Sequence, residues 1–338
     1  MDRPRSIGLK EFLRRDREAV FVDRKRRTIK EMERAANHAV AALGPDQDVQ
    51  RIEHSHVGRL KRHLKDKGLS PASITKVIRY LQGAFTRGLR HSQVVSNPFA
   101  AVELPKVQRN KVAFYETEQV EALVEAAPGP WWKTLIRLAF TSGLRQGELL
   151  NLLWEDGDFA RSTVTVTPKA ARTFQAGGRQ YPIFEWTAKD YATRVVRIPK
   201  STVEALRALR DFQEPPRSAY VFLSLDALDG LAEYMSSHDG DLPDKLVNNI
   251  TRDFASIRRQ AEASMAEGVD DPQPWTATGF HALRKSYGTV MAQRVRPHEL
   301  QRLFGHSDIK TTMSFYVGET DTSEQVEAAF KDAFTSDS

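Results

Sequence analysis

Three stretches of the chain carry side chains that could act together on an anionic substrate. The first, T-S-G-L-R-Q-G-E, places Arg145 after a glycine break and a glutamate three positions later. By itself, that spacing is typical of an ion pair on a helix surface. His281 and Arg284 then share one face of a predicted helix, and a third motif soon after them contains His306 and Tyr316. Arginine binds anions, histidine exchanges protons near neutral pH and tyrosine can act as a nucleophile, so the set combines groups that could serve one active site.

These motifs resemble those of the tyrosine recombinase family, also called the phage integrase family. The resemblance rests on TSGLRQGELLNLLW, HALRKSYGT and LFGHSDIKTTMSFY, which occur here in the family's order. It implies a mainly α-helical protein with a small antiparallel β-sheet, in which a helical N-terminal DNA-binding domain precedes an α+β catalytic domain. It also implies a site-specific recombinase or integrase that cleaves and rejoins DNA strands through a covalent 3′-phosphotyrosyl intermediate, without a metal or cofactor.

The resemblance also assigns active-site residues. The family's first arginine, its H-x-x-R pair, its G-H histidine and its tyrosine fall here on Arg145, His281, Arg284, His306 and Tyr316. Ten positions lead from His306 to Tyr316, one more than is commonest in the family. Tyr316 is the only tyrosine after Tyr287, so no other residue of this segment competes as the nucleophile.

The reaction expected from the resemblance explains the residue types. A phosphodiester repels nucleophiles, so a catalyst must neutralise its non-bridging oxygens. Arg145 and Arg284 would clamp the phosphate with paired donors while Tyr316 attacks it. Because a phenol has a pKa of about 10, cations or a base must favour its phenolate. His281 and His306 can accept a proton or donate a hydrogen bond to the phosphate, and the sequence leaves the division of these duties open.

The family also has a lysine in a β-hairpin between its two arginine segments, suited to protonate the departing 5′ hydroxyl. Two residues compete for this role. Lys189 lies in WTAKDYATRVVRIP, which resembles the family's lysine turn and the arginine-containing strand after it, and we favour this residue. Lys169, in TPKAAR, would otherwise be a loop lysine that touches phosphate or water. Glu148 is expected to support the first arginine segment through hydrogen bonds.

Composition is consistent with a folded protein of two domains. The chain has 338 residues, of which 40% are hydrophobic, enough for two separate cores. It contains no cysteine, which excludes disulfides, thiolate catalysis and cysteine-based zinc sites. Its first residues lack the apolar run of a secretory signal, and no apolar stretch approaches the roughly 20 residues that span a bilayer. We therefore expect a cytoplasmic protein without a membrane partner.

Charge is distributed unevenly. Residues 1–110 contain 24 lysines and arginines against 12 aspartates and glutamates, whereas the remainder is acidic enough to leave the whole chain at +6. A basic segment of this kind binds polyanions through phosphate contacts, so the distribution favours double-stranded DNA as a partner. The candidate phosphate contacts are Arg24 to Arg27, Lys76, Arg79, Arg87 and Arg90, each of which could instead be simply solvated.

The domains and their elements follow from hydrophobic periodicity and turn signals. We expect an N-terminal domain at 1–105, a linker at about 97–112 and a catalytic domain at 113–338. The predicted helices are 7–22, 24–43, 53–67, 71–90, 116–127, 131–142, 201–213, 245–266, 281–294, 297–304 and 323–334. Strands are predicted at 162–167, 181–187 and 193–198 within one small sheet, with a loop at 168–180.

The last predicted helix, 323–334, carries Val326, Phe330 and Phe334 on one face. This stripe could dock on a neighbouring protomer, as in the family's synaptic tetramer on DNA, or on its own domain. Accessory DNA-bending proteins are further possible partners.

Three other functions remain as alternatives. A non-catalytic DNA-binding protein on the same scaffold would not need the catalytic set. A type IB topoisomerase shares arginine, lysine, histidine and tyrosine chemistry, and would relax supercoiled DNA without a recombination site. A metal-dependent nuclease or transposase would lose its activity to a chelator, but the carboxylates show no two-metal spacing.

Overall fold

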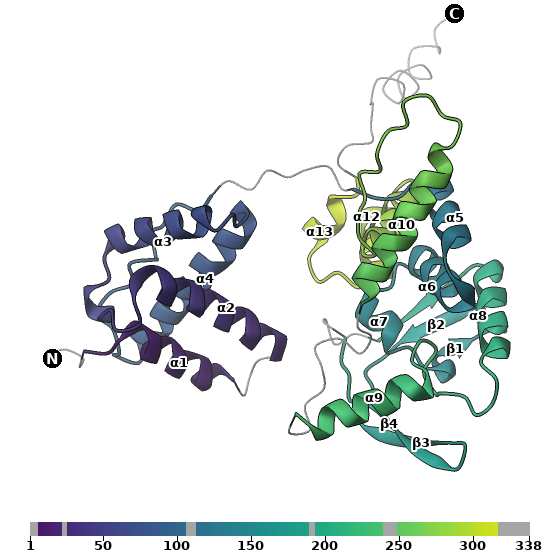
Figure 1. The fold of residues 1–338 in the computed structure, drawn as a ribbon, viewed down its shortest axis with the longest axis horizontal. Coiled ribbons are helices and arrows are strands. Elements are labelled where there is room, and N and C mark those ends of the chain that lie inside the picture. The colour runs from purple at the N-terminus through teal and green to yellow at the C-terminus, as the bar shows by residue number, and fades with distance from the viewer. Residues whose placement is uncertain (1–5, 22–25, 106–112, 189–192, 239–248, 317–338) are drawn as a thin grey trace, which may run out of the picture. The chain divides into compact units, whose positions relative to one another are not determined.

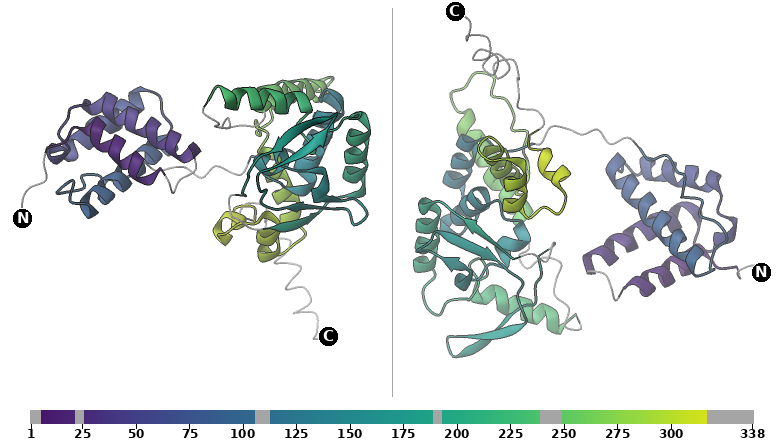
Figure 2. Two further views of the ribbon diagram at one scale, coloured as in Figure 1. Left: turned by 90° about the horizontal axis from the view of Figure 1, so that it is seen from below. Right: turned by 180° about the vertical axis from the view of Figure 1, so that it is seen from behind.

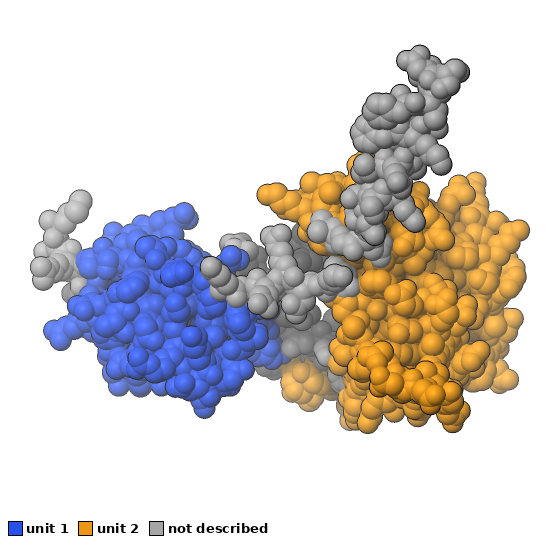
Figure 3. All heavy atoms as spheres, turned by 90° about the horizontal axis from the view of Figure 1, so that it is seen from above, with its two compact units in different colours: residues 1–109 blue, residues 110–338 orange. Residues whose placement is uncertain are grey.

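The computed structural model describes residues 6–21, 26–105, 113–188, 193–238 and 249–316. Contacts divide the chain into two compact units, residues 1–109 and 110–338 (Figure 3). The structure is mostly helical, and its short antiparallel strands lie in the second unit (Figure 1). None of the helices in these ranges combines the length and apolar character needed to cross a bilayer.

The first unit is built from four helices, as predicted. They are α1 (Leu9–Val20), α2 (Arg26–Leu43), α3 (His54–Asp66) and α4 (Pro71–Arg90). The Ser70 hydroxyl caps α4 by accepting a hydrogen bond from the Ser73 N–H at 3.3 Å, and Pro71 occupies the first helical position. The apolar faces of the helices meet in one core, where the Phe85 ring lies 5.0 Å from that of Phe12 and 5.2 Å from that of Phe99.

A partly buried ion pair joins α1 to α4. Arg87 donates two hydrogen bonds to the buried Asp16 carboxylate, at 2.7 and 2.8 Å. Arg87 was a predicted phosphate contact, but its guanidinium already has this bidentate partner, so the residue belongs to the packing of the unit. Lys76, Arg79 and Arg90 are exposed on α4.

The second unit contains nine helices among its described residues. They are α5 (Thr117–Ala126), α6 (Gly129–Ser142), α7 (Gln146–Leu150), α8 (Lys200–Phe212), α9 (Leu225–Ser236), α10 (Ile250–Ala266), α11 (Ala282–Ala292), α12 (Pro297–Phe304) and α13 (Ile309–Met313). The sequence did not predict α9 or α13. The predicted helix at 323–334 lies outside the described residues, as does part of the predicted linker.

A three-stranded antiparallel sheet lies beside these helices. Its strand order is β1 (Gly157–Asp158), β2 (Thr163–Val166) and β5 (Arg194–Arg197). Val164 pairs with Val196, and Val166 pairs with Arg194. The three valines are buried in the main core of the unit, so this face of the sheet is the one that packs inward.

A second, two-stranded sheet corrects the prediction for residues 168–187. β3 (Arg172–Ala176) forms within the predicted loop and pairs with β4 (Arg179–Ile183), which does not join the other three strands. This hairpin lies beside α9 (Figure 2), and Tyr181 and Ile183 share a small core with Leu228 and Leu231 of that helix. The strands are therefore stabilised by packing on a distant segment, which local periodicity does not reveal.

One pair of residues closes the base of this hairpin. Lys169 and Trp186 exchange backbone hydrogen bonds of 2.7 and 3.0 Å. The chain therefore leaves β2, forms the hairpin, and returns to its starting point before continuing to β5.

Candidate active site

A left-handed turn sets the position of Arg145. α6 ends at Ser142, and Gly143 follows with φ of 62°. A Cβ atom at Gly143 would lie 2.3 Å from Cδ1 of Tyr287, so both the backbone and the space require glycine. The chain reverses at this point, and Arg145 becomes the N-cap of α7.

Replacing Gly143 by alanine should destabilise the protein through both effects. We expect about 1–2 kcal/mol from the left-handed backbone and about 1–3 kcal/mol from crowding against Tyr287. Thermal unfolding should show a lowered midpoint. Gly230→Ala is the matched control, because Gly230 lies within α9 with nothing near its missing Cβ, and it should leave the midpoint unchanged or raise it. Equal midpoints for the two variants would contradict this account of the turn.

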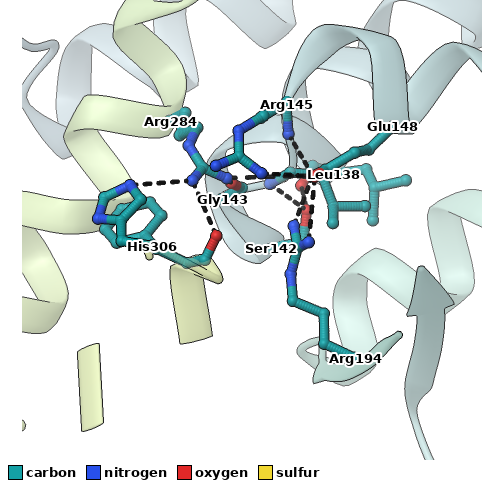
Figure 4. Close-up of polar contacts among 10 residues, drawn as sticks. Leu138, Ser142, Gly143, Arg145, Glu148, Arg194, Arg284 and His306 are labelled. Atoms are coloured by element: carbon teal, nitrogen blue, oxygen red, sulfur yellow. Dashed lines mark hydrogen bonds and ion pairs between the residues drawn. The ribbon is translucent and has the colours of Figure 1, made fainter. Parts of the chain in front are cut away.

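Arg284 joins the Gly143 turn to the end of α12. It lies in the first turn of α11, with a side chain only 5% exposed. Its Nη1 donates to the Gly143 carbonyl, and its Nη2 donates to the Phe304 carbonyl at 3.0 Å (Figure 4). The guanidinium carbon also lies 4.3 Å from the centre of the Phe304 ring. Segments 141 positions apart in the sequence therefore meet at one cation.

His306 lies beside this cation. Its Nε2 is 3.2 Å from Nη2 of Arg284, and its Nδ1 is 2.9 Å from the Thr312 hydroxyl oxygen. Because a guanidinium can only donate, the contact with Arg284 assigns Nε2 as the acceptor and Nδ1–H as the donor to Thr312. The ring also stacks on Phe304, with centroids 4.8 Å apart, so its orientation is fixed on three sides.

His281 is the N-cap of α11 at the edge of the site. Its pKa is lowered by partial loss of hydration and by the positive charges of Arg284, Lys285 and Arg145. The ring is therefore neutral at pH 7 and able to accept a proton.

Glu148 is the anion at the centre of these cations, and its side chain is 1% exposed. Its Oε1 accepts hydrogen bonds from Nη1 of Arg145 and Nη1 of Arg194, both at 3.0 Å. Its Oε2 accepts from the Arg145 backbone N–H at 2.8 Å and from Nη2 of Arg194 at 2.5 Å (Figure 4). Burial alone would raise the pKa of this carboxyl, but the hydrogen bonds and charges of the two arginines outweigh it and hold the pKa below its usual value. The hydrogen bonds to Arg145 provide the support that the sequence predicted for Glu148.

Tyr316 follows α13 and packs in a small cluster with Tyr287, Leu300 and Phe304. Its hydroxyl donates a hydrogen bond of 2.6 Å to the Val295 carbonyl. Burial of the phenol and the negative charge of Glu299 raise its pKa. The structure therefore brings Arg145, Arg284 and His306 together, whereas the Tyr316 hydroxyl is bonded to the backbone before α12.

Comparison with known proteins decides the family. The model of the phage integrase family matches residues 113–322, which is more than half of the chain. The chain belongs to the phage integrase family. It is 27% identical to a tyrosine recombinase XerC-like protein of Caldanaerobacter subterraneus subsp. tengcongensis over 278 residues, covering 78% of this chain and 67% of that one. It is 25% identical to tyrosine recombinase XerC of Xanthomonas campestris pv. campestris over 280 residues, covering 81% and 73%. The resemblance noted in the sequence is confirmed, and the activity is that of a tyrosine recombinase in site-specific DNA recombination.

Solved structures support the fold of this integrase. The Tn1549 transposon integrase, in complex with transposon right end DNA, matches with a TM-score of 0.69 and 18% identity, over 96% of this chain and 100% of that one. A lambda integrase tetramer bound to a Holliday junction matches with a TM-score of 0.67 and 16% identity, over 94% and 80%. These likenesses confirm the predicted fold class of a mainly helical protein with small antiparallel sheets.

The described part of the chain includes one of the two candidate lysines of this integrase. Lys189 lies outside the described residues. Lys169 is 7% exposed, and its ammonium lies 2.5 Å from Oδ1 of Asp156, whose Oδ2 accepts the Leu153 N–H at 2.8 Å. Lys169 is therefore bound in a buried ion pair at the base of the β3–β4 hairpin.

Arg194 is the residue of the integrase site that sequence reasoning missed. It appeared only as part of the strand after the lysine turn, although it binds both oxygens of Glu148. One signal was present: Arg194 shares its strand face with Val196, which is buried. A charged residue on the inward face of a strand indicates a buried partner of opposite charge.

Proposed function

We propose that this recombinase cleaves DNA by attack of the Tyr316 hydroxyl oxygen on a backbone phosphorus. A bond forms between that oxygen and the phosphorus, the bond to the 5′ oxygen breaks, and a 3′-phosphotyrosyl ester results. The departing 5′ oxygen takes up a proton. A 5′ hydroxyl of another strand then attacks the ester and releases Tyr316. The ester conserves the energy of the broken bond, so strand rejoining requires neither ATP hydrolysis nor a metal ion.

The convergence of Arg145 and Arg284 on Glu148, with His306 beside them, carries this proposal. Two guanidiniums held from different segments can neutralise the non-bridging oxygens of one phosphate. A non-catalytic DNA-binding protein would have no need to bury such cations away from the general surface, because exposed lysines and arginines suffice for phosphate contacts.

The two histidines suit different duties. Partial loss of hydration, together with the neighbouring cations, lowers the pKa of His281 and favours its neutral form, which can accept the phenolic proton of Tyr316. His306 holds Thr312 through Nδ1 and has Nε2 directed at Arg284, a position suited to a hydrogen bond with the phosphate once that nitrogen is protonated.

Tyr316 must leave the Val295 carbonyl before it can attack. In that hydrogen bond the phenol is the donor, and Glu299 opposes its ionisation. Movement toward Arg145 and Arg284 would exchange a negative neighbour for positive ones and favour the phenolate.

Lys189 is the proposed general acid for the 5′ hydroxyl. The ion pair of Lys169 with Asp156 supports this choice, because a general acid must reach the departing oxygen and Lys169 is already bound and buried.

Double-stranded DNA is the proposed partner of both units. The first unit contributes its basic charge, with Lys76, Arg79 and Arg90 of α4 and Arg24 to Arg27 as phosphate contacts. The second unit contributes Arg145, His281, Arg284 and His306.

Assembly into a tetramer on DNA is part of the proposal, because strand exchange joins two duplexes, each cut on both strands. The solved lambda integrase tetramer on a Holliday junction has the same fold. The stripe of Val326, Phe330 and Phe334 is the proposed contact, either with a neighbouring protomer or within its own domain. Accessory DNA-bending proteins would act on the same complex, in the cytoplasm.

The test is covalent capture of DNA. The protein is incubated with fragmented host DNA, denatured, and the DNA that remains attached is sequenced and used as the substrate. Wild type should give a slow-moving adduct on a denaturing gel, and Tyr316→Phe should give none. Tyr234→Phe, which alters a half-buried tyrosine of α9 that stacks on His238, is the matched control and should give the wild-type amount. Adduct from Tyr316→Phe at the wild-type level would refute the assignment.

The same material separates the alternatives. Relaxation of supercoiled DNA that lacks the captured site would indicate a topoisomerase. Activity abolished by a chelator and restored by magnesium would indicate a metal-dependent nuclease.

A further inference from the structure

Arg194 lies where three segments of the second unit meet. It is the first residue of β5, and its side chain is 11% exposed. Its Nη1 and Nη2 bind the two oxygens of Glu148 separately, at 3.0 and 2.5 Å. On its other side it lies against Gly305, where a Cβ atom would be 3.4 Å from Nη1 and 3.5 Å from Cδ of Arg194. One side chain therefore binds the α7 segment through Glu148 and lies near the residue before His306.

The backbone conformation accounts for the glycine at this point. Gly305 ends α12 with φ of 62°, a conformation that favours glycine. A Cβ atom there would make ordinary van der Waals contacts with Arg194, so the nearness of Arg194 does not itself exclude a side chain. The G-H motif of the sequence thus provides the turn that leads to His306.

The contacts of Arg194 fill hydrogen-bond acceptor positions of the Glu148 carboxylate. The carboxylate accepts four hydrogen bonds, two from Arg145 and two from Arg194. Arg284 lies further away, with its Nη1 4.0 Å from Oε2. Without Arg194, two of the four acceptor positions would be vacant in a buried site, and the carboxylate would draw Arg145 and Arg284 toward itself. Cations bound tightly to a carboxylate are less available to a phosphate.

We propose that Arg194 is a positioning residue for strand cleavage, which saturates Glu148 so that Arg145 and Arg284 keep their geometry and charge for the scissile phosphate. The inference rests on the proposed phosphate-binding role of Arg145 and Arg284. Arg194 itself need not touch DNA, because its two Nη groups are engaged by Glu148.

Single-turnover cleavage tests this role with the captured DNA as substrate. Arg194→Gln should slow adduct formation by about 10–100-fold, as is usual when the support of a reactive group is lost. DNA affinity, measured by mobility shift in a Tyr316→Phe background, should stay unchanged. Arg194→Lys should recover part of the rate, since an ammonium neutralises Glu148 but cannot bind both oxygens at this geometry. Arg197→Gln removes an exposed arginine of the same strand and should cleave at the wild-type rate.

A double-mutant cycle separates positioning from general structural support. If Arg194 acts by saturating Glu148, then Arg194→Gln should cost little further rate in a Glu148→Gln background. Independent, multiplying losses would overturn the inference, as would a wild-type rate for Arg194→Gln, or for Arg194→Lys if the glutamine variant does not fold. Arg145→Gln keeps the two proposals apart: if it cleaves like wild type, the proposed phosphate site has failed, whatever the Arg194 variants do.

Discussion

Replacing Arg284 by lysine should slow strand cleavage by about 10²–10³-fold, the usual effect of losing one donor to the developing charge of a transition state. Lysine keeps the positive charge but has one ammonium in place of a planar fork. It cannot bind the Gly143 and Phe304 carbonyls and also present paired donors to a phosphate. The rate of adduct formation with excess protein measures the effect.

Arg294→Lys is the control for that experiment. Arg294 follows α11 at the exposed end of the same segment, and its Nη1 donates to the Val290 carbonyl at 3.3 Å. This variant should cleave at the wild-type rate. A small and equal effect of both substitutions would show that charge alone matters at position 284.

Glu148→Gln should cost about 3–5 kcal/mol of folding free energy, because it leaves buried arginines without their counter-charge. Glutamine has nearly the same size, so the loss reports charge more than volume. Chemical denaturation at pH 7 should show the unfolding transition of the second unit at a much lower denaturant concentration. Glu155→Gln, in an exposed pair with Arg172, should cost at most about 1 kcal/mol.

The pH dependence of that difference has a defined sign. The pKa of Glu148 is lower in the folded protein than its usual 4.5, so the folded state favours the ionised form. Its contribution is fully present above pH 4.5 and is lost as the pH falls through the lowered value. The gap in stability between wild type and Glu148→Gln should therefore narrow below pH 4.5. A gap that stays constant or widens there would contradict the ionised, arginine-bound state of Glu148.

Local signals predicted the helices that carry their own start and stop residues. α4 begins at Ser70-Pro71, and α12 spans residues 297–304 as predicted, between Pro297 and Gly305. β3 was missed because Arg172 to Ala176 is mostly exposed and has little apolar alternation. Its pairing with β4 depends on packing against α9, which lies far away in the sequence and was itself not predicted.

The sequence could predict which residues belong to the candidate site, but not the contacts between them. The resemblance of the motifs to those of the family identified Arg145, Arg284 and His306. The motifs could not show that Arg194 completes the surroundings of Glu148, because that contact joins residues 46 positions apart. Nor could they show the hydrogen bond of Tyr316 to Val295, which depends on how the chain folds back after α13.

The backbone hydrogen bonds between Lys169 and Trp186 close the β3–β4 hairpin at its base, so the hairpin is structurally independent of the three-stranded sheet. Because both ends of the hairpin meet at one point, residues inserted at Gly178 in its tip, where no atom lies within 4 Å of the missing Cβ, should leave the register of β2 with β5 unchanged. For protein engineering, this tip is a place where a reporter or affinity module can be grafted while the recombination chemistry is left intact.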